Sequence, residues 1–388
     1  MNVKKILFVL HEATRSGAPI LLLELLKEIQ SAQKYEVDLL ILLNGTMAKD
    51  FTDLVPTAVN IKHFQPRPNI ITRILRRFIV LKNDVLSQED LYNAAVEKLS
   101  SKNYDCVIGM TVATLSILEK FKAKGLKTIL YTHELQFALE SFYDAHDLSR
   151  KISSLDSILA GSQSVKDFLT QRYKISASKI SVAYSFISKD NEIKTKAPEL
   201  RQQYNISDDT FILGTLSTQE LRKGSELIPL LAKKIKQKTP NLKFKIFNIG
   251  GNDQNPFVRF AKIDTQKLGV EEQVIFVENT KNPNDYINIF DCFLLPSRED
   301  PFPLVMHLAA EFNKPIVGFK DSGGVEEFLN GTNLLADYLD IDQFADIIIK
   351  THDDKIFREK SLLKIKDNVH KFSKENSMTI IYKAIDNI

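Results

Sequence analysis

The sequence predicts an α/β protein with two domains, each built on a parallel sheet. At 388 residues, the chain is longer than one hydrophobic core usually serves. Short apolar runs of strand length alternate with helix-length segments, which is typical of parallel sheets covered by helices. This alternation occurs before and after a polar, proline-containing stretch at 188–207, where we place the boundary between the domains.

The composition indicates a globular protein and excludes several function classes. The chain is 44% hydrophobic and 26% charged, and its net charge of +3 gives no reason to expect nucleic acid. No apolar run approaches the roughly 20 residues of a membrane span, and the N-terminal run is shorter than a signal-peptide core. Cys106 and Cys292 lie in apolar strand patterns, so we expect buried free thiols and a cytoplasmic protein.

The first strand–helix series begins at the N-terminus. Continuous apolar runs predict buried strands at 3–10, 37–43, 105–110, 127–131 and 156–160. A leucine-rich helix follows the first strand and ends near 29, and further helices are expected at 113–121 and after the capping turn 161–165. A last apolar run at 180–186 closes the series.

The loop between the first strand and its helix is a candidate anion site. Gly17 lets backbone approach a ligand closely, and Pro19 suits the first helical turn. A phosphate here would meet free amides at the positive end of the helix. The loop lacks GxGxxG, so no dinucleotide is expected, and a plain strand–helix connector explains it about as well.

The segment 67–82 combines three arginines, Arg73, Arg76 and Arg77, with an apolar face. A basic amphipathic segment can lie on an anionic membrane surface, which would place the protein peripherally at the inner face of a membrane. An ordinary surface helix with its apolar stripe in the core is the favoured alternative.

The second series follows the polar boundary. Apolar runs predict strands at 211–214, 244–249, 274–277, 292–295 and 316–319. Helical patterns occupy 226–236, 286–290, 304–312, 341–350 and 373–388. Because the two series echo each other, twin Rossmann-like domains are expected.

Polar loops follow the strands of this second series. Arg222 and Lys223 precede a helix, Asn279 follows the strand 274–277, and Asp300 lies in the loop after the strand 292–295. Open α/β sheets bind ligands at the carboxyl ends of their strands, so these loops predict a site for a polar small molecule. The cations suit phosphate, the carboxylate can accept hydrogen bonds from sugar hydroxyls, and we expect them at opposite ends of the ligand.

A histidine and a glutamate, His133 and Glu134, lie just past the strand 127–131. This position suits a role in a cleft between the domains. A lone histidine is more often structural, and that alternative stays open on the residues alone.

The stretch 294–327 closely resembles the donor-site signature of retaining glycosyltransferases of the two-domain GT-B class, family 4 (glycosyl transferases group 1). The residues that carry the resemblance are Pro296, Ser297, Asp300, Phe302, Pro303, Leu304, Gly323, Gly324 and Glu327. The turn 222–224 and the pair at 133–134 also resemble motifs of that family. The resemblance implies two Rossmann-like domains facing across a cleft. It implies an N-terminal acceptor domain at 1–190, a donor-binding domain at 205–370 and a helix at 371–388 that crosses back.

The resemblance also implies the reaction and the roles of the site residues. A metal-independent hexosyltransferase without a cofactor would move a sugar from a nucleotide diphosphate donor to a glycan or lipid-linked acceptor in surface polysaccharide or glycolipid synthesis. His133 and Asp300 would be the catalytic residues. The expected donor-binding residues are Gly17, Arg222, Lys223, Asn279, Pro301, Phe302, Pro303, Leu304 and Glu327. The two cations would stabilise charge on the leaving diphosphate.

Two positions depart from the family pattern and support an alternative. Leu308 stands where the family has a second acidic residue that holds the donor ribose, and Thr215 stands where it often has an arginine. The alternative is a GT-B protein with a degenerate donor site that acts as a non-catalytic glycan- or partner-binding module. A GT-B epimerase or phosphorylase fits the sequence less well.

Overall fold

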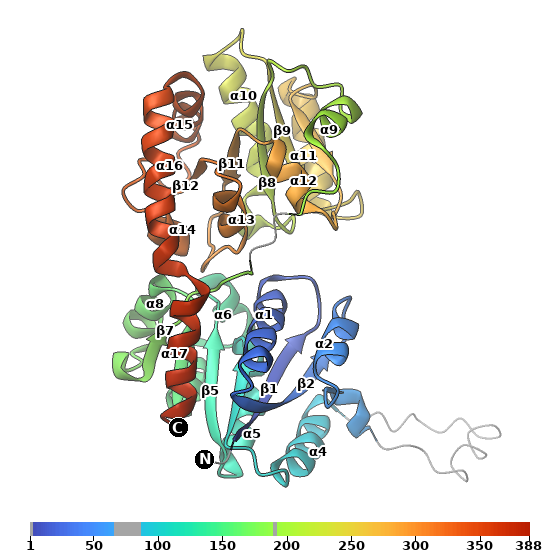
Figure 1. The fold of residues 1–388 in the computed structure, drawn as a ribbon, viewed down its shortest axis with the longest axis vertical. Coiled ribbons are helices and arrows are strands. Elements are labelled where there is room, and N and C mark those ends of the chain that lie inside the picture. Colours follow the sequence, from blue (N-terminus) through green and yellow to red (C-terminus); the bar gives the residue numbers. More distant parts are fainter. Residues whose placement is uncertain (1–2, 66–86, 189–191) are drawn as a thin grey trace, which may run out of the picture.

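Two parallel sheets, one in each half of the chain, organise the fold (Figure 1). The computed structural model describes residues 3–65, 87–188 and 192–388. The basic segment with Arg73, Arg76 and Arg77 therefore lies outside the described residues. Below, the first domain is the sheet β1–β7 with its helices, and the second domain is the sheet β8–β13 with its helices.

The first sheet has seven strands in the order β3-β2-β1-β4-β5-β6-β7. Their bounds are β1 (Lys4–Glu12), β2 (Tyr35–Leu43), β3 (Val59–Asn60), β4 (Cys106–Met110), β5 (Lys127–Thr132), β6 (Ser157–Ala160) and β7 (Ile180–Val182). Along β1, Ile6 and Phe8 join one hydrophobic cluster while Leu7 and Val9 join another. Both faces of the sheet are therefore buried, which explains the continuous apolar runs of the sequence.

Helices cover both faces of this sheet. They are α1 (Gly17–Ala32), α2 (Ala48–Leu54), α4 (Gln88–Ser100), α5 (Leu115–Ala123), α6 (Gln136–Phe142), α7 (Ala145–Ser154) and α8 (Gln163–Tyr173), with 3-10 turns η1 (Ile61–Phe64), η2 (Val112–Thr114) and η3 (Ala177–Lys179). The hydroxyl of Ser162 accepts a hydrogen bond from the amide of Val165, which confirms the predicted cap of α8.

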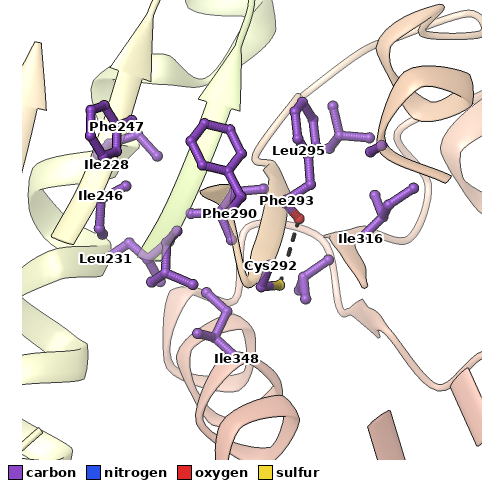
Figure 2. Close-up of a cluster of buried hydrophobic side chains, with 14 of the residues drawn as sticks. Ile228, Leu231, Ile246, Phe247, Phe290, Cys292, Phe293, Leu295, Ile316 and Ile348 are labelled. Carbon is purple, nitrogen blue, oxygen red and sulfur yellow. Dashed lines mark hydrogen bonds between the residues drawn. The ribbon is translucent and has the colours of Figure 1, made fainter. Parts of the chain in front are cut away.

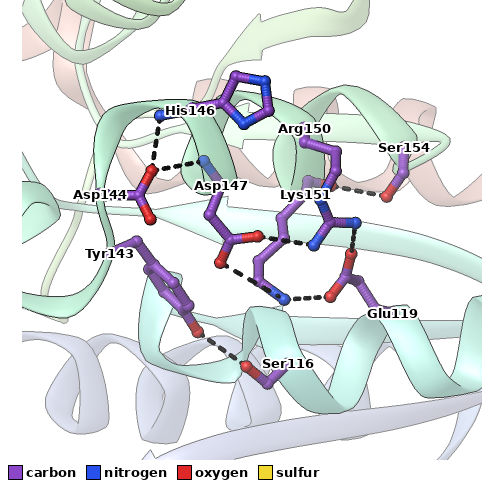
Figure 3. Close-up of polar contacts among 9 residues, drawn as sticks. All are labelled: Ser116, Glu119, Tyr143, Asp144, His146, Asp147, Arg150, Lys151 and Ser154. Atoms are coloured by element: carbon purple, nitrogen blue, oxygen red, sulfur yellow. Dashed lines mark hydrogen bonds and ion pairs between the residues drawn. The ribbon is translucent and has the colours of Figure 1, made fainter.

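An ionic network fixes α7 against α5 (Figure 3). Arg150 lies 2.7 Å from both Glu119 and Asp147, and Lys151 also pairs with Glu119. The carboxylate of Asp144 accepts hydrogen bonds from two amides at the start of α7.

The second sheet has six strands in the order β10-β9-β8-β11-β12-β13. Their bounds are β8 (Phe211–Leu216), β9 (Phe244–Ile249), β10 (Val274–Val277), β11 (Cys292–Leu295), β12 (Ile316–Phe319) and β13 (Leu335–Ala336). The helices are α9 (Ala197–Gln203), α10 (Ile228–Lys238), α11 (Pro256–Leu268), α12 (Pro283–Ile289), α13 (Val305–Glu311), α14 (Gly324–Phe328), α15 (Ile341–Asp353) and α16 (Lys355–Val369), with 3-10 turns η4 (Leu221–Lys223), η5 (Ser225–Leu227) and η6 (His370–Phe372). The fold class inferred from the sequence, α/β with two parallel sheets, is confirmed.

The core of the second domain is packed around β8 and β11 (Figure 2). Phe290 fills the space that a glycine leaves, since a Cβ at Gly214 would lie 2.1 Å from its ring. Cys292 points into the same core, and both cysteines are buried and free, as expected.

The last helix, α17 (Lys374–Asp386), returns to the first domain (Figure 1). Its residues Met378, Ile381 and Ile385 belong to the same cluster as Phe8 of β1. In the polar stretch 188–207, α9 had not been anticipated, and its Leu200 is part of the second core. Among the described residues, no helix has the length and apolar character needed to cross a membrane.

Candidate functional site

The loop between β8 and α10 carries the two cations predicted to hold a diphosphate. Arg222 and Lys223 lie in η4, which ends at Gly224. Gly224 has a φ of 64°, and a Cβ there would lie 1.9 Å from the carbonyl oxygen of Pro296. This glycine therefore lets the cationic loop pack directly on the loop that follows β11.

Asp300 lies in that second loop, and its carboxylate contacts Lys223 directly. Lys223 Nζ is 2.5 Å from Asp300 Oδ2, and Asp300 is only 3% exposed. The backbone of Asp300 is fixed as well, because its amide donates to the carbonyl of Ser322 and its carbonyl accepts from Gly324. The two loops were expected at opposite ends of a ligand, whereas here the lysine and the aspartate form an ion pair.

Arg222 extends this ionic cluster. Its Nη1 donates to the carbonyl oxygen of Glu299 at 2.9 Å, and its Nη2 lies 2.7 Å from Glu220. Sequence reasoning missed Arg298, which pairs with Glu226 and donates to the carbonyl of Leu221 in η4. In the sequence, the sign of this role was an arginine in the same polar loop as Asp300. Each of these cations therefore already has an anionic partner.

Glu134 supports the opposite side of the site, in the first domain. Its carboxylate accepts hydrogen bonds from the amides of His133 and Val112, at 2.8 and 3.3 Å, and from the hydroxyl of Thr132 at 2.7 Å. Burial raises the pKa of Glu134, while these hydrogen bonds and the charge of Arg222 lower it. The two halves of the site lie close together, since a Cβ at Gly323 of the second domain would lie 2.8 Å from Cδ1 of Leu135, two residues after His133.

His133 is packed between Tyr131 and Gly161. The centroids of the Tyr131 and His133 rings are 4.2 Å apart, and a Cβ at Gly161 would lie 2.4 Å from His133 Nδ1. Burial lowers the pKa of His133 to about 3, so the ring is neutral at pH 7. Its Nε2 is buried and has no hydrogen-bond partner in the described part of the chain. A neutral imidazole with a free nitrogen can make one hydrogen bond to a ligand.

Two carboxylates of the second domain accept hydrogen bonds from helix starts of the first. Glu299 accepts from the amide of Phe137 in α6, at 3.1 and 3.2 Å to its two oxygens. Glu327 of α14 accepts from the amides of Gln163 and Ser164 at the start of α8, at 3.0 and 2.7 Å, and from the Ser164 hydroxyl at 2.6 Å. The donor-binding role expected for Glu327 stays a prediction, and in this structure the residue joins the domains.

The remaining predicted residues lie in the turn before α13, at the start of α1 and after β10. Phe302 is buried, with ring centroids 5.1 Å from both Tyr184 and Phe372, so a contact with a donor would come from its backbone. The other residues of the turn are Pro301 and Pro303, which are buried, and Leu304, the N-cap of α13. Gly17, at the start of α1, and Asn279, just after β10, are exposed. No hydrogen bond or ion pair between described residues joins either of them to the cluster.

A hollow of about 510 Å³ lies elsewhere on the first domain, between β6, β7 and α17. Lys166, Lys179 and Lys383 are among the residues that line it. It contains none of the residues predicted for the site, and it is separate from the facing loops of Lys223 and Asp300.

The chain is similar to known proteins in sequence and in fold. Residues 196–371 match the family described as Glycosyl transferases group 1. The crystal structure of Anabaena Alr3699/HepE in complex with UDP-glucose matches with a TM-score of 0.79, covering 99% of this chain and 100% of that chain at 16% identity. The chain has the GT-B glycosyltransferase fold.

Two other glycosyltransferases are similar over most of the chain. The apo structure of the lipopolysaccharide outer core galactosyltransferase WaaB has a TM-score of 0.70 and 17% identity, covering 99% of both chains. The Escherichia coli O-antigen biosynthesis glycosyltransferase WclY is 22% identical over 317 residues, which are 81% of this chain and 79% of that protein. The family match, the relative and the fold together support a glycosyltransferase.

Proposed function

We propose that this protein is a retaining GT-B glycosyltransferase of family 4 that moves a sugar from a nucleoside diphosphate sugar to an acceptor hydroxyl. The observation that carries the proposal is that the loop of Asp300, which pairs with Lys223, meets the loop after His133 of the other domain. Glu299 accepts hydrogen bonds from the amide of Phe137, and a Cβ at Gly323 would lie 2.8 Å from Cδ1 of Leu135. A neighbour of the same fold was solved with UDP-glucose, which makes UDP sugars the first donors to test. The retaining outcome rests on the resemblance of residues 294–327 to the family signature.

The ion pair between Lys223 and Asp300 suggests how a donor is bound. A donor diphosphate would replace Asp300 as the partner of Lys223, with Arg222 alongside. The released carboxylate of Asp300 would then accept a hydrogen bond from a hydroxyl of the transferred sugar. Each charged group keeps a partner, so the exchange avoids leaving a buried charge unpaired. The cations then stabilise the charge that develops on the leaving diphosphate.

On the opposite side, His133 would contact the sugar. Its ring is neutral, and its unpartnered Nε2 is available for one hydrogen bond. Glu134 has a different part, because its carboxylate already accepts three hydrogen bonds and holds the loop in place. We assign Glu134 to the support of His133 and not to attack on the sugar.

We place the acceptor on the first domain, beside α6. Phe137 and Phe142 of this helix are 58% and 50% exposed, and the Phe142 ring lies 5.9 Å from that of His11. Exposed aromatic rings next to polar groups suit the apolar faces of sugar rings. Since the names of WclY and WaaB refer to O-antigen and lipopolysaccharide, we propose a glycan or lipid-linked acceptor of surface polysaccharide or glycolipid synthesis, used in the cytoplasm.

A second candidate function rests on Leu308 and Thr215. Leu308 packs against the core of the second domain, and Thr215 is only 1% exposed. A site without these polar contacts to a donor would fit a non-catalytic glycan- or partner-binding module. The complete cationic turn at 222–224 favours the enzyme.

A donor panel tests the proposal. Nucleoside diphosphate sugars, UDP-glucose among them, are screened by thermal shift, since a ligand of the folded state raises its Tm. Those that bind are incubated with glycan and lipid-linked acceptors, and the product mass and anomeric configuration are determined. Transfer with retention is expected. If no nucleotide sugar is transferred or hydrolysed, the proposed enzymatic function is refuted. Glycan binding without nucleotide binding would favour the non-catalytic module.

A further inference from the structure

Ser185 contacts a histidine of each domain. It lies just after β7, in the segment that leads from the first domain to the second, and is 5% exposed. Its hydroxyl oxygen is 3.2 Å from Nδ1 of His133, and its carbonyl oxygen is 3.1 Å from Nε2 of His307. His307 belongs to α13, the helix that directly follows the loop of Asp300. One residue therefore connects the His133 ring to the second domain.

The contact of His307 fixes where its own proton lies. A carbonyl oxygen can only accept a hydrogen bond, so Nε2 of His307 must be the protonated nitrogen. Burial lowers the pKa of His307 to about 4, so the ring is neutral at pH 7 and carries only this proton. His307 is thus a neutral donor that holds the backbone of Ser185.

The hydroxyl of Ser185 fixes the tautomer of His133 in turn. Within the described residues, His133 Nδ1 is the one acceptor within reach of this hydroxyl. The hydroxyl proton is therefore satisfied only if it points at Nδ1, and this places the ring proton of neutral His133 on Nε2. Nε2 is the nitrogen left without a partner, so it is offered to a ligand as a donor.

We propose that Ser185 and His307 are positioning residues, which keep His133 as a neutral Nε2–H donor and couple its orientation to contact between the two domains. The inference rests on the proposed function for the identity of the acceptor, which would be an oxygen of the bound sugar. It goes beyond that function by naming the residues that set the tautomer. If α13 moves away, the carbonyl of Ser185 loses its donor, and the hydroxyl loses the geometry that orients His133.

Kinetics of paired variants test each contact. Ser185→Ala removes the hydroxyl and Ser185→Thr keeps it, whereas His307→Phe removes the donor and His307→Gln keeps one. Misplaced catalytic contacts cost up to about a hundredfold in rate, so kcat should fall about tenfold to a hundredfold in Ser185→Ala and His307→Phe. The KM of the donor should stay within about threefold, since the phosphate contacts are untouched. Ser181→Ala is the matched control, because Ser181 lies in β7 of the same segment and its side chain is exposed.

The ring nitrogen shifts of His133 test the tautomer independently of activity. In protein labelled with ¹⁵N-histidine, Nε2 of His133 should show the shift of a protonated nitrogen and Nδ1 that of a bare one. Ser185→Ala and His307→Phe should mix the tautomers, and Ser185→Thr and His307→Gln should restore the wild-type spectrum.

The outcomes separate this inference from the proposed function. A proton on Nδ1 in the wild type, or unchanged shifts in Ser185→Ala, would overturn the role of Ser185. Equal behaviour of His307→Phe and His307→Gln would overturn the role of His307. If the wild type transfers no sugar, the function fails, and the nitrogen shifts still decide the tautomer.

Discussion

The first domain holds its half of the site by packing and hydrogen bonds, whereas the second domain holds its half by ion pairs. In the first, His133 is packed against Tyr131 and hydrogen-bonded to Ser185. In the second, Lys223 pairs with Asp300, and Arg222 pairs with Glu220. Figure 1 shows the two domains joined end to end, with α16 along one and α17 along the other.

This difference suggests two tasks: the first domain positions His133, and the second domain exchanges an ion-pair partner for the donor phosphate. Neutral hydrogen bonds between packed groups fix geometry and change little when an anion arrives. An ion pair can exchange one partner for another of like charge, so the second domain can open its cluster to a phosphate. We therefore expect changes to the ion pairs of the second domain to affect donor binding, and changes to the contacts that hold His133 to affect the chemical step.

The largest expected effect follows from Lys223→Met. It removes the charge expected to hold the diphosphate and leaves the buried carboxylate of Asp300 without its cation. Transfer, measured as kcat/KM, should fall about 100-fold to 1000-fold, the usual loss when a key electrostatic contact is removed. Lys223→Arg should lose less. Lys234→Met, which breaks an exposed pair with Asp342, is the matched control and should stay near wild type. A Lys223→Met enzyme with wild-type kcat/KM would break the comparison.

The neutral ring of His307 predicts how the stability of the protein depends on pH. The pKa of His307 is about 4 in the folded protein, against about 6.5 in an unfolded chain. Between these values the unfolded chain binds a proton that the folded chain does not, so stability falls as the pH drops through this window. From pH 7 to pH 5, the wild type should lose about 2 kcal/mol more than His307→Gln.

This difference is measured by denaturant unfolding of both proteins at both pH values. Glu134 and Glu299, whose pKa values are raised mainly by burial, are present in both proteins, so their effect cancels in the difference. Equal losses in the two proteins would show that His307 is not held neutral.

A carboxylate that joins the domains gives the next smaller effect. Glu327→Ala removes the acceptor for two amides and a hydroxyl at the start of α8. A lost charge-assisted contact of this kind costs about 1–3 kcal/mol, so transfer should fall about tenfold and X-ray scattering should show a wider spread of domain distances. The neighbouring Glu326→Ala is the control, because Glu326 accepts a hydrogen bond from Asp321 within its own domain. Identical behaviour of the two variants would contradict the interdomain role.

Removal of divalent metal gives the smallest expected change. We assign charge neutralisation on the leaving diphosphate to Arg222 and Lys223, so EDTA treatment should change kcat by less than about twofold. The measurement is an initial rate before and after chelation. A loss that Mg²⁺ restores would show that a cation shares the work of the second domain.

The sequence predicts the strands better than the helices, for a physical reason. The strands at 274–277, 292–295 and 316–319 were predicted with the bounds they have, because buried parallel strands are continuous apolar runs. The helix α16 was missed. Its buried residues include Ser361 and Asn368, and the side-chain amide of Asn368 donates to two backbone carbonyls. A helix that buries polar groups lacks the apolar period by which helices are recognised.

The sequence also locates the loops of the site without their contacts. The positions of Arg222, Lys223, Asp300 and His133 after strands follow from the pattern of parallel sheets. The pairing of Lys223 with Asp300 joins residues 77 positions apart, and Glu327 reaches Ser164 over 163 positions. Such contacts depend on how the loops and domains pack together, which no local pattern contains.

The division between the two halves of the site is tested most directly by calorimetric titration with the nucleoside diphosphate of the preferred donor. Three proteins are compared: the wild type, Lys223→Met and His133→Asn. A charge-assisted contact is worth about 1.5–3 kcal/mol, so Lys223→Met should bind at least about tenfold more weakly, while His133→Asn should bind within about threefold of wild type. Equal loss of affinity in both variants, or no loss in Lys223→Met, would contradict the account.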